Sequence, residues 1–175
     1  MEDLLVNRVA NSSLIQLDLE DWYDARPRKN FDLKDYLYQE LIVKELDFRS
    51  TLKAHDWAQY SDAHLAIHCS VDAIVPTWAY MLVANYAAPF ATTITFGNLE
   101  QIDVILFDRW IEKLELEPYR NGKVIVKGCS KHPVPISAYV TISARLTPVV
   151  QSLMFGEPCS NVPLYKRKKE TTVSV

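Results

Sequence analysis

Glycine is scarce in this sequence, with only four among 175 residues. Neither the G-x-G-x-x-G pattern of dinucleotide-binding folds nor the phosphate-binding loop of nucleoside triphosphatases is present, because both need several glycines close together. The G-x-S-x-G pattern around the nucleophile of many serine hydrolases is missing as well. These absences argue against a dinucleotide, nucleoside triphosphate or serine hydrolase site of the usual kind.

Long apolar runs are also lacking. The stretch 79–91 comes nearest to the roughly 18–20 apolar residues of a membrane span, but Asn85 and Pro89 interrupt it. The first residues carry neither a basic segment nor a long apolar stretch of the kind that opens a secretory signal. A net charge of −3 leaves no basic excess for nucleic acid. We therefore expect a soluble, cytoplasmic protein that binds neither membranes nor nucleic acid.

The composition indicates a folded protein, since 49% of the residues are hydrophobic and can form a substantial core. The length fits one domain, so residues 1–175 are expected to form a single α/β domain with a flexible basic tail at about 166–175. No internal repeat with a period of 20–50 residues is visible.

The order of apolar and polar residues predicts alternating strands and helices. Residues 13–20 alternate in the manner of a half-buried strand at or near an edge. Further along, short strand patterns and helical patterns follow one another, which is typical of parallel strands with helical crossovers. We expect a three-layer αβα sandwich with a mainly parallel, Rossmann-like or flavodoxin-like sheet and an additional edge strand. The strands are predicted at 64–69, 92–97 and 123–129, and the helices at 73–88, 98–116 and from 135.

Individual residues mark the expected ends of elements. Asp32 is placed to cap a helix, and Asn98 and Gln101 have the spacing of a capping box. Pro148 is expected to restart the last helix as a second piece, because proline is tolerated in a first helical turn. From Gly156 onward the chain is interpreted as irregular.

Cysteine is rare, and each of the three, Cys69, Cys129 and Cys159, is followed by serine. Cys69 and Cys129 each end a predicted strand before a predicted helix. With the strand order of flavodoxin-like sheets, these two strands would be neighbours about 4.8 Å apart, so their thiols are expected to meet. Cys159 follows the last helix and is expected to join them.

Three thiolates on short loops suit zinc or an iron–sulfur cluster. A fourth ligand could be Asp72 or His132, each three residues after a cysteine, whereas His68 should face the opposite side of the sheet. The simpler alternatives stay open. Each cysteine could be a small buried hydrophobe, Asp72 the cap of helix 73–88, and His132 a solvated loop residue.

The spacing of the three cysteines matches no known zinc pattern, so two other functions are considered for the same residues. In the first, Cys129 or Cys159 is a nucleophile of low pKa that accepts a persulfide sulfur without a metal. In the second, the cysteines are structural, and the chain is a non-catalytic module that forms a homodimer through the apolar helix 73–88.

Long stretches at 69–82 and 152–167, with shorter ones at 40–49 and 55–60, resemble a bacterial family known as domain of unknown function 2480. The resemblance covers about residues 31–168. It implies a setting beside the sulfur-mobilisation machinery of iron–sulfur assembly, whose proteins are then candidate partners. It also favours Asp72 as the fourth ligand.

Our first hypothesis is therefore a cytoplasmic accessory protein that binds zinc or an iron–sulfur species. Its expected ligands are Cys69, Cys129 and Cys159, with Asp72 or His132 completing the site.

Overall fold

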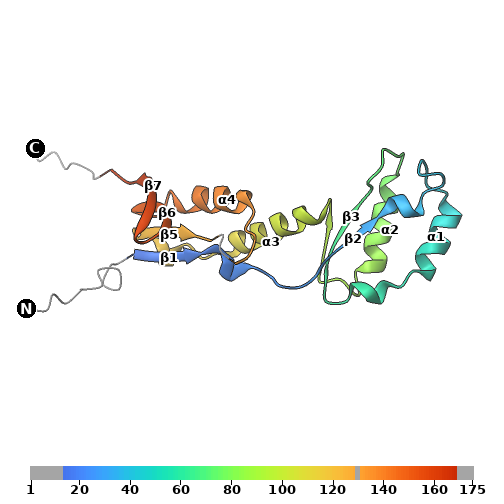
Figure 1. The fold of residues 1–175 in the computed structure, drawn as a ribbon, viewed down its shortest axis with the longest axis horizontal. Helices are drawn as coiled ribbons and strands as arrows, with labels where there is room; N and C mark the ends of the chain where they lie inside the picture. The colour runs from blue at the N-terminus through green and yellow to red at the C-terminus, as the bar shows by residue number, and fades with distance from the viewer. Residues whose placement is uncertain (1–13, 129–130, 169–175) are drawn as a thin grey trace, which may run out of the picture. The chain divides into compact units, whose positions relative to one another are not determined.

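The computed structural model describes residues 14–128 and 131–168 (Figure 1). The chain divides into two compact units. Unit 2 is the continuous segment Asp24–Leu106, and unit 1 combines the residues up to Tyr23 with those from Phe107 onward. Both units contain helices and mainly parallel strands, so the expected α/β class is confirmed. The single domain for residues 1–175 stays a prediction.

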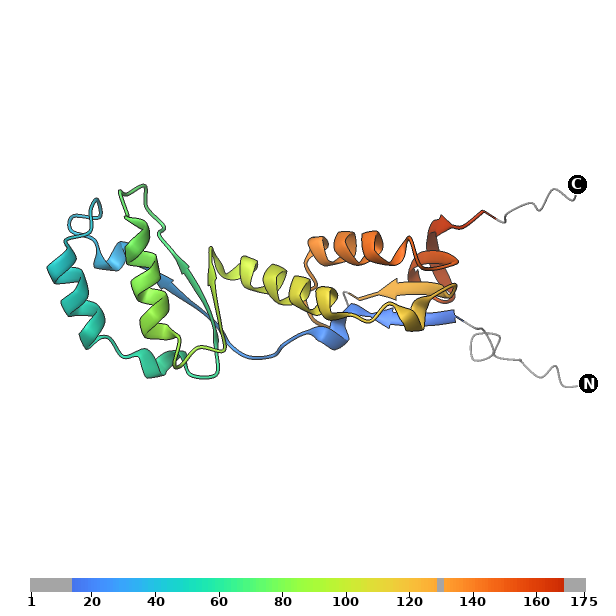
Figure 2. The ribbon, with the colours of Figure 1, turned by 180° about the vertical axis from the view of Figure 1, so that it is seen from behind.

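Unit 2 contains a parallel sheet of three strands in the order β2-β3-β4. The strands follow one another in chain order, so right-handed crossovers place the connecting helices α1 and α2 on one face. Figures 1 and 2 show both helices on the same side of this sheet. The elements are β2 (Arg28–Asp32), the 3₁₀ helix η2 (Leu33–Tyr36), α1 (Glu45–Ala54), η3 (Trp57–Tyr60), β3 (His64–His68), α2 (Thr77–Ala87) and β4 (Thr93–Phe96).

The core of unit 2 lies between this sheet and the two helices. Helix α2 is apolar on most of its surface, and it buries Ala79, Val83 and Ala87, which recur every fourth residue on one face. The buried part of the cluster comprises Phe31, Leu33, Phe48, Leu52, Trp57, Tyr60, Leu65, Ile67, Ala79, Val83 and Ala87.

An ion pair joins the beginning and the end of unit 2. The Arg28 Nη2 atom lies 2.6 Å from Asp103 Oδ1, and Arg28 Nε donates to the same oxygen at 3.1 Å. The two side chains are 13% and 22% exposed, so the pair is largely shielded from water. Arg28 is on β2, and Asp103 is on α3 (Leu99–Lys113), which begins in unit 2 and ends in unit 1.

Unit 1 contains a sheet of four strands in the order β1-β5-β6-β7. The first three are parallel, and β7 is antiparallel to β6. Strand β1 lies at the edge that the alternating pattern predicted. The elements are β1 (Leu14–Asp18), η1 (Leu19–Trp22), η4 (Glu117–Tyr119), β5 (Lys123–Lys127), α4 (Ile136–Leu146), β6 (Ser152–Glu157) and β7 (Ser160–Lys166).

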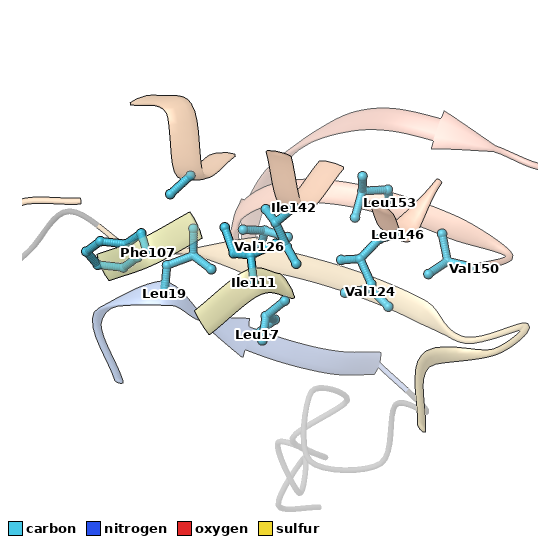
Figure 3. Close-up of a cluster of buried hydrophobic side chains, with 11 residues drawn as sticks. Leu17, Leu19, Phe107, Ile111, Val124, Val126, Ile142, Leu146, Val150 and Leu153 are labelled. Atoms are coloured by element: carbon cyan, nitrogen blue, oxygen red, sulfur yellow. The ribbon is translucent and has the colours of Figure 1, made fainter. Parts of the chain in front are cut away.

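The core of unit 1 packs one face of this sheet against α4 and the later part of α3 (Figure 3). Strand β5 contributes the alternate residues Val124 and Val126 to that face, as the pleat of a strand requires, and β1 and β6 contribute Leu17 and Leu153. The buried members are Leu17, Leu19, Phe107, Ile111, Val124, Val126, Ala138, Ile142, Leu146, Val150 and Leu153.

Three details of the sequence-based prediction are wrong. Helix α4 ends at Leu146 and does not restart at Pro148. The chain from Gly156 onward is not irregular, because β6 and β7 form a hairpin there. The strands before Cys69 and Cys129 are not neighbours, since β3 and β5 belong to different sheets.

The two units are built on the same plan, at a constant spacing in the sequence. Tyr60 ends η3 and Tyr119 ends η4, a spacing of 119 − 60 = 59 residues. The chain then turns through Asp62 and Asn121, which have positive φ angles of 53° and 56° and are again 59 residues apart. An internal repeat is therefore present, with a period longer than the 20–50 residues considered above.

Packing and backbone geometry follow the same spacing at several described positions of the segments 45–98 and 104–157. Phe48 and Phe107 are both buried, and Gly97 and Gly156 both have positive φ angles, of 124° and 116°. Nine pairs of residues are identical between the two segments. They are Phe48/Phe107, Tyr60/Tyr119, Val75/Val134, Pro76/Pro135, Ala79/Ala138, Tyr80/Tyr139, Pro89/Pro148, Phe96/Phe155 and Gly97/Gly156.

The first strands of the two units also correspond, although they are separated by 32 − 18 = 14 residues in place of 59. Asp18 ends β1 and accepts a hydrogen bond from the backbone N–H of Glu20 at 3.0 Å. Asp32 ends β2 and accepts one from the N–H of Lys34, also at 3.0 Å. Asp32 thus caps the short helix η2, as the sequence predicted. Unit 2 therefore stands in the chain between the first strand of unit 1 and the rest of that unit.

Candidate functional site

Polar side chains gather where the strands of unit 2 end. Asp32 is the last residue of β2, His68 is the last residue of β3, and Cys69 and Ser70 follow directly. Asp32 Oδ1 accepts hydrogen bonds from the backbone N–H groups of Lys34 and Ser70, each at 3.0 Å. The His68 Nε2 atom lies 3.6 Å from Asp32 Oδ2. The carboxylate thus holds the loop after β3 against the end of β2.

The surroundings of Asp32 keep its side chain ionised. Burial alone would raise its pKa, but hydrogen bonds from the Ser70 side chain and from the N–H groups of Lys34 and Ser70 lower it. The charge of nearby His68 lowers it further, and the net pKa lies below the ordinary value of 3.8. Asp32 is therefore a carboxylate at neutral pH.

Cys69 and Tyr80 complete this group from the helical face of the sheet. Cys69 is partly buried against the unit 2 core, and its Sγ donates a hydrogen bond to the Val71 carbonyl at 3.4 Å. Burial raises the pKa of Tyr80, and electrostatic interactions with Cys69 and Asp32 raise it further. The phenol of Tyr80 therefore stays protonated and can donate a hydrogen bond to an anion. We call Asp32, His68, Cys69 and Tyr80 the strand-end site.

Asp72 lies in the loop between Cys69 and α2, and its side chain is exposed. Helix α2 begins at Thr77 after Pro76, and no side chain caps it. The interpretation of Asp72 as the helix cap is therefore wrong.

Unit 1 has a related group of residues at the end of β5. Asp18 Oδ2 lies 3.4 Å from Lys127 Nζ, and Tyr139 corresponds to Tyr80. A Cβ atom added to Gly128 would lie 2.7 Å from the Tyr139 hydroxyl, so a side chain at 128 would displace this phenol. The spacing of 59 residues pairs Cys69 with Gly128, and it pairs Ser70 with Cys129, which lies outside the described residues.

The other two predicted ligands belong to unit 1. Cys159 is exposed in the two-residue turn between β6 and β7. His132 is exposed, and its ring stacks on Tyr23 with centroids 4.3 Å apart and planes 4° from parallel. This stacking gives His132 a structural partner that the sequence pattern did not indicate.

Residues 14–128 and 131–168 contain no group of three or more histidine, cysteine, aspartate or glutamate side chains that could hold a metal ion. Cys69 and Asp72 belong to unit 2, Cys159 and His132 to unit 1, and Cys129 is not described. The structure therefore does not bring the five predicted ligands together in the part that it describes, and a metal site stays a prediction.

Asp32 and Tyr80 were not expected at a site, and His68 was ranked low. The sequence does hold a signal for them in the repeated segments. D-L-E-D-W at 18–22 matches D-L-K-D-Y at 32–36, and P-T-W-A-Y at 76–80 matches P-I-S-A-Y at 135–139. The first pair begins at the last residues of β1 and β2, and the second pair opens α2 and α4.

A family model described as "Protein of unknown function (DUF2480)" matches residues 3–167. The chain belongs to this family. The match spans both units, so the repeat lies within one family domain model. No curated protein and no solved structure matches the chain. Among the helices in the described part of the chain, none has the length and apolar character needed to cross a membrane.

Proposed function

We propose that this protein handles sulfur through the thiol of Cys69, which accepts a sulfane sulfur and holds it as a persulfide. One observation carries the proposal. The thiol lies at the carboxyl ends of parallel strands, where such sheets commonly bind ligands, beside a phenol that stays protonated. Asp32 and His68 place a carboxylate and an imidazole 3.6 Å apart at the ends of the same strands.

The transfer needs no oxidant other than the donor itself. Cys69 loses its proton to solvent, and the thiolate attacks the outer sulfur of a persulfide donor, R–S–SH. A sulfur–sulfur bond forms at Cys69 while the bond in the donor breaks, and the donor leaves as the thiolate R–S⁻. After the Cys69–S–SH product releases its proton to solvent, Tyr80 would stabilise the persulfide anion by donating a hydrogen bond to it.

Replacement of Cys69 by serine is expected to abolish the gain of sulfur. The full chain would be incubated without air with a low-molecular-weight persulfide, and the alkylated peptides would be measured by mass spectrometry. Cys159→Ser is the matched control, because it removes an exposed thiol outside the strand-end site. An unchanged sulfur load in Cys69→Ser, or a load carried only by Cys159, would contradict the proposal.

Binding of zinc or an iron–sulfur cluster is the second candidate function, and the placement of cysteine in the sequence favours it. Cys69 follows β3 directly, and Cys129 stands two residues after the end of β5 in the sequence. With Cys159 and either Asp72 or His132, these thiols would supply soft ligands. The protein would then serve as a cytoplasmic accessory factor for iron–sulfur assembly proteins.

Metal and sulfide content distinguishes the two candidates. Protein purified without air is expected to carry about one zinc per chain, or iron together with sulfide, if the second candidate holds. The triple variant with all three cysteines replaced by alanine should then lose that metal. Unchanged metal content in the triple variant would exclude these thiols as the ligands.

A further inference from the structure

Each unit contains an apolar hollow between its second helix and the strand that follows it. In unit 1 the hollow has a volume of about 270 Å³, and in unit 2 it also has a volume of about 270 Å³. Four lining positions correspond at the spacing of 59 residues. They are Ile67 and Val126, Tyr80 and Tyr139, Ala84 and Ser143, and Phe96 and Phe155.

The hollow of unit 1 is bordered by β7. Strand β7 pairs with β6 in antiparallel register, with Val162 opposite Phe155 and Tyr165 opposite Leu153. Val162 and Leu164 form the part of the lining that has no counterpart in unit 2. In unit 1, therefore, an extended strand with apolar side chains occupies the outer edge of the sheet and closes the side of the hollow. Figures 1 and 2 both show β7 running beside β6.

In the described part of the chain, the matching edge of unit 2 carries no strand. The repeat ends just after Gly97, because the chain continues into α3 where unit 1 makes its hairpin. Strand β4 is the last strand of its sheet among the described residues. Phe96 is 71% exposed, compared with 38% for its counterpart Phe155, and Met81 at the rim of the hollow is 66% exposed. An edge strand beside exposed apolar side chains is a ready template for pairing with another strand.

We propose that the free edge of β4 binds an extended segment of another polypeptide as an added antiparallel strand. The segment would carry apolar or aromatic side chains at the positions opposite Ile94 and Phe96, as β7 does opposite Leu153 and Phe155. Main-chain hydrogen bonds would hold the segment, and the hollow beside Tyr80 would select its apolar side chain.

A second copy of this chain fits the edge less well than a single strand does. In a second copy the matching side chains would be Ile94 and Phe96, and these already line that copy's own hollow. In unit 1 the corresponding place at the sheet edge is taken by the single strand β7, which follows β6 with no helix between them. The occupant that the repeat indicates is therefore an isolated extended peptide.

The test uses a peptide of residues 160–168, S-N-V-P-L-Y-K-R-K, which covers β7. The full chain is mixed with this peptide, and backbone hydrogen exchange is followed by residue. We expect slower exchange in β4, around Thr93–Phe96. A control peptide with Val162→Asp and Leu164→Asp should give no such protection, since its alternate apolar side chains are gone.

Two substitutions locate the site. Phe96→Asp is expected to weaken binding at least about tenfold, because exposed aromatic anchors carry much of such binding energy. Val140→Asp is the matched control, since Val140 is 64% exposed and stands in unit 1 where Met81 stands in unit 2. It should leave binding unchanged.

Three results would overturn the proposal. The first is an absence of protection in β4 at saturating peptide. The second is protection of β6 in place of β4, which would mean that the peptide displaces β7. The third is protection of β4 in the peptide-free chain that grows with protein concentration, which would identify a second copy as the occupant.

Discussion

Phe107→Ala is expected to reduce the free energy of unfolding by about 3–5 kcal/mol. Phe107 is 2% exposed and packs in the unit 1 core with Leu19 and Ile111 (Figure 3). Removing its ring takes away apolar contacts and leaves a cavity that close-packed neighbours fill only in part. Chemical denaturation followed by circular dichroism measures the change.

Two other variants make this result informative. Trp110→Ala lies on the same helix at a residue that is 50% exposed, so it should cost less than Phe107→Ala. Phe48→Ala removes the counterpart of Phe107 in unit 2, which is 1% exposed, and should cost a similar amount. The single-domain prediction requires both Phe→Ala variants to shift one common transition. Separate transitions for the two units would contradict it.

Asp32→Ala is expected to cost about 1–2 kcal/mol at neutral pH. The alanine side chain cannot accept the hydrogen bonds from the N–H groups of Lys34 and Ser70. Asp32→Asn keeps a capping oxygen and removes the charge, so it should cost less. Both values follow from urea unfolding of each variant at pH 7.

Asp32 also predicts how the stability of the protein changes as the pH falls. The pKa of Asp32 is lower in the folded state than the ordinary value of 3.8, so the unfolded state takes up a proton first as the pH falls. The stabilising contribution is present above about pH 3.8 and is lost as the pH falls through the folded-state pKa. Asp32→Asn should lack this loss. An acid profile identical to that of the unsubstituted protein would contradict the assignment.

The local elements follow from the sequence because their signals are local. Asn98 and Gln101 form the expected capping box, with the N–H of Asn98 donating to Gln101 Oε1 at 3.0 Å and the N–H of Gln101 donating to Asn98 Oδ1 at 3.3 Å. The apolar pattern of α2 and the alternation in β1 likewise depend on neighbouring residues. Which strands pair depends on distant residues, and that part of the prediction was wrong.

The repeat is hard to see in the sequence, because equivalent core positions keep an apolar residue but not the same amino acid. Leu52 and Ile111 are both buried in equivalent places, yet they differ in sequence. The repeated Cys-Ser pair also indicates a wrong alignment of the two repeated segments. Matching Cys69 with Cys129 requires a shift of 60 residues, whereas the fold repeats at 59 and pairs Cys69 with Gly128. A shift of one residue changes which side chains face the site.

Strand β7 was missed for a different reason. Pro163 lies within it, and proline cannot donate to a ladder of strand hydrogen bonds, which argues against a central strand. The structure resolves this conflict by placing β7 at the edge of the sheet, with a register shift in its pairing at Leu153 and Met154. An edge strand tolerates proline because one side of it needs no partner.

The ion pair between Arg28 and Asp103 has a consequence for how the chain folds. Strand β1 must pair with β5, whose residues lie more than 100 positions later in the chain, as with Leu14 and Lys123. Closing so long a flexible loop costs conformational entropy. Unit 2 is continuous, so we expect that it can fold before β1 pairs with β5, and the ion pair between Arg28 and Asp103 then joins residues near its two ends. Once unit 2 is folded, the segment between β1 and β5 behaves as a much shorter loop. The insertion of unit 2 therefore adds little to the entropic cost of pairing β1 with β5 in the sheet of unit 1.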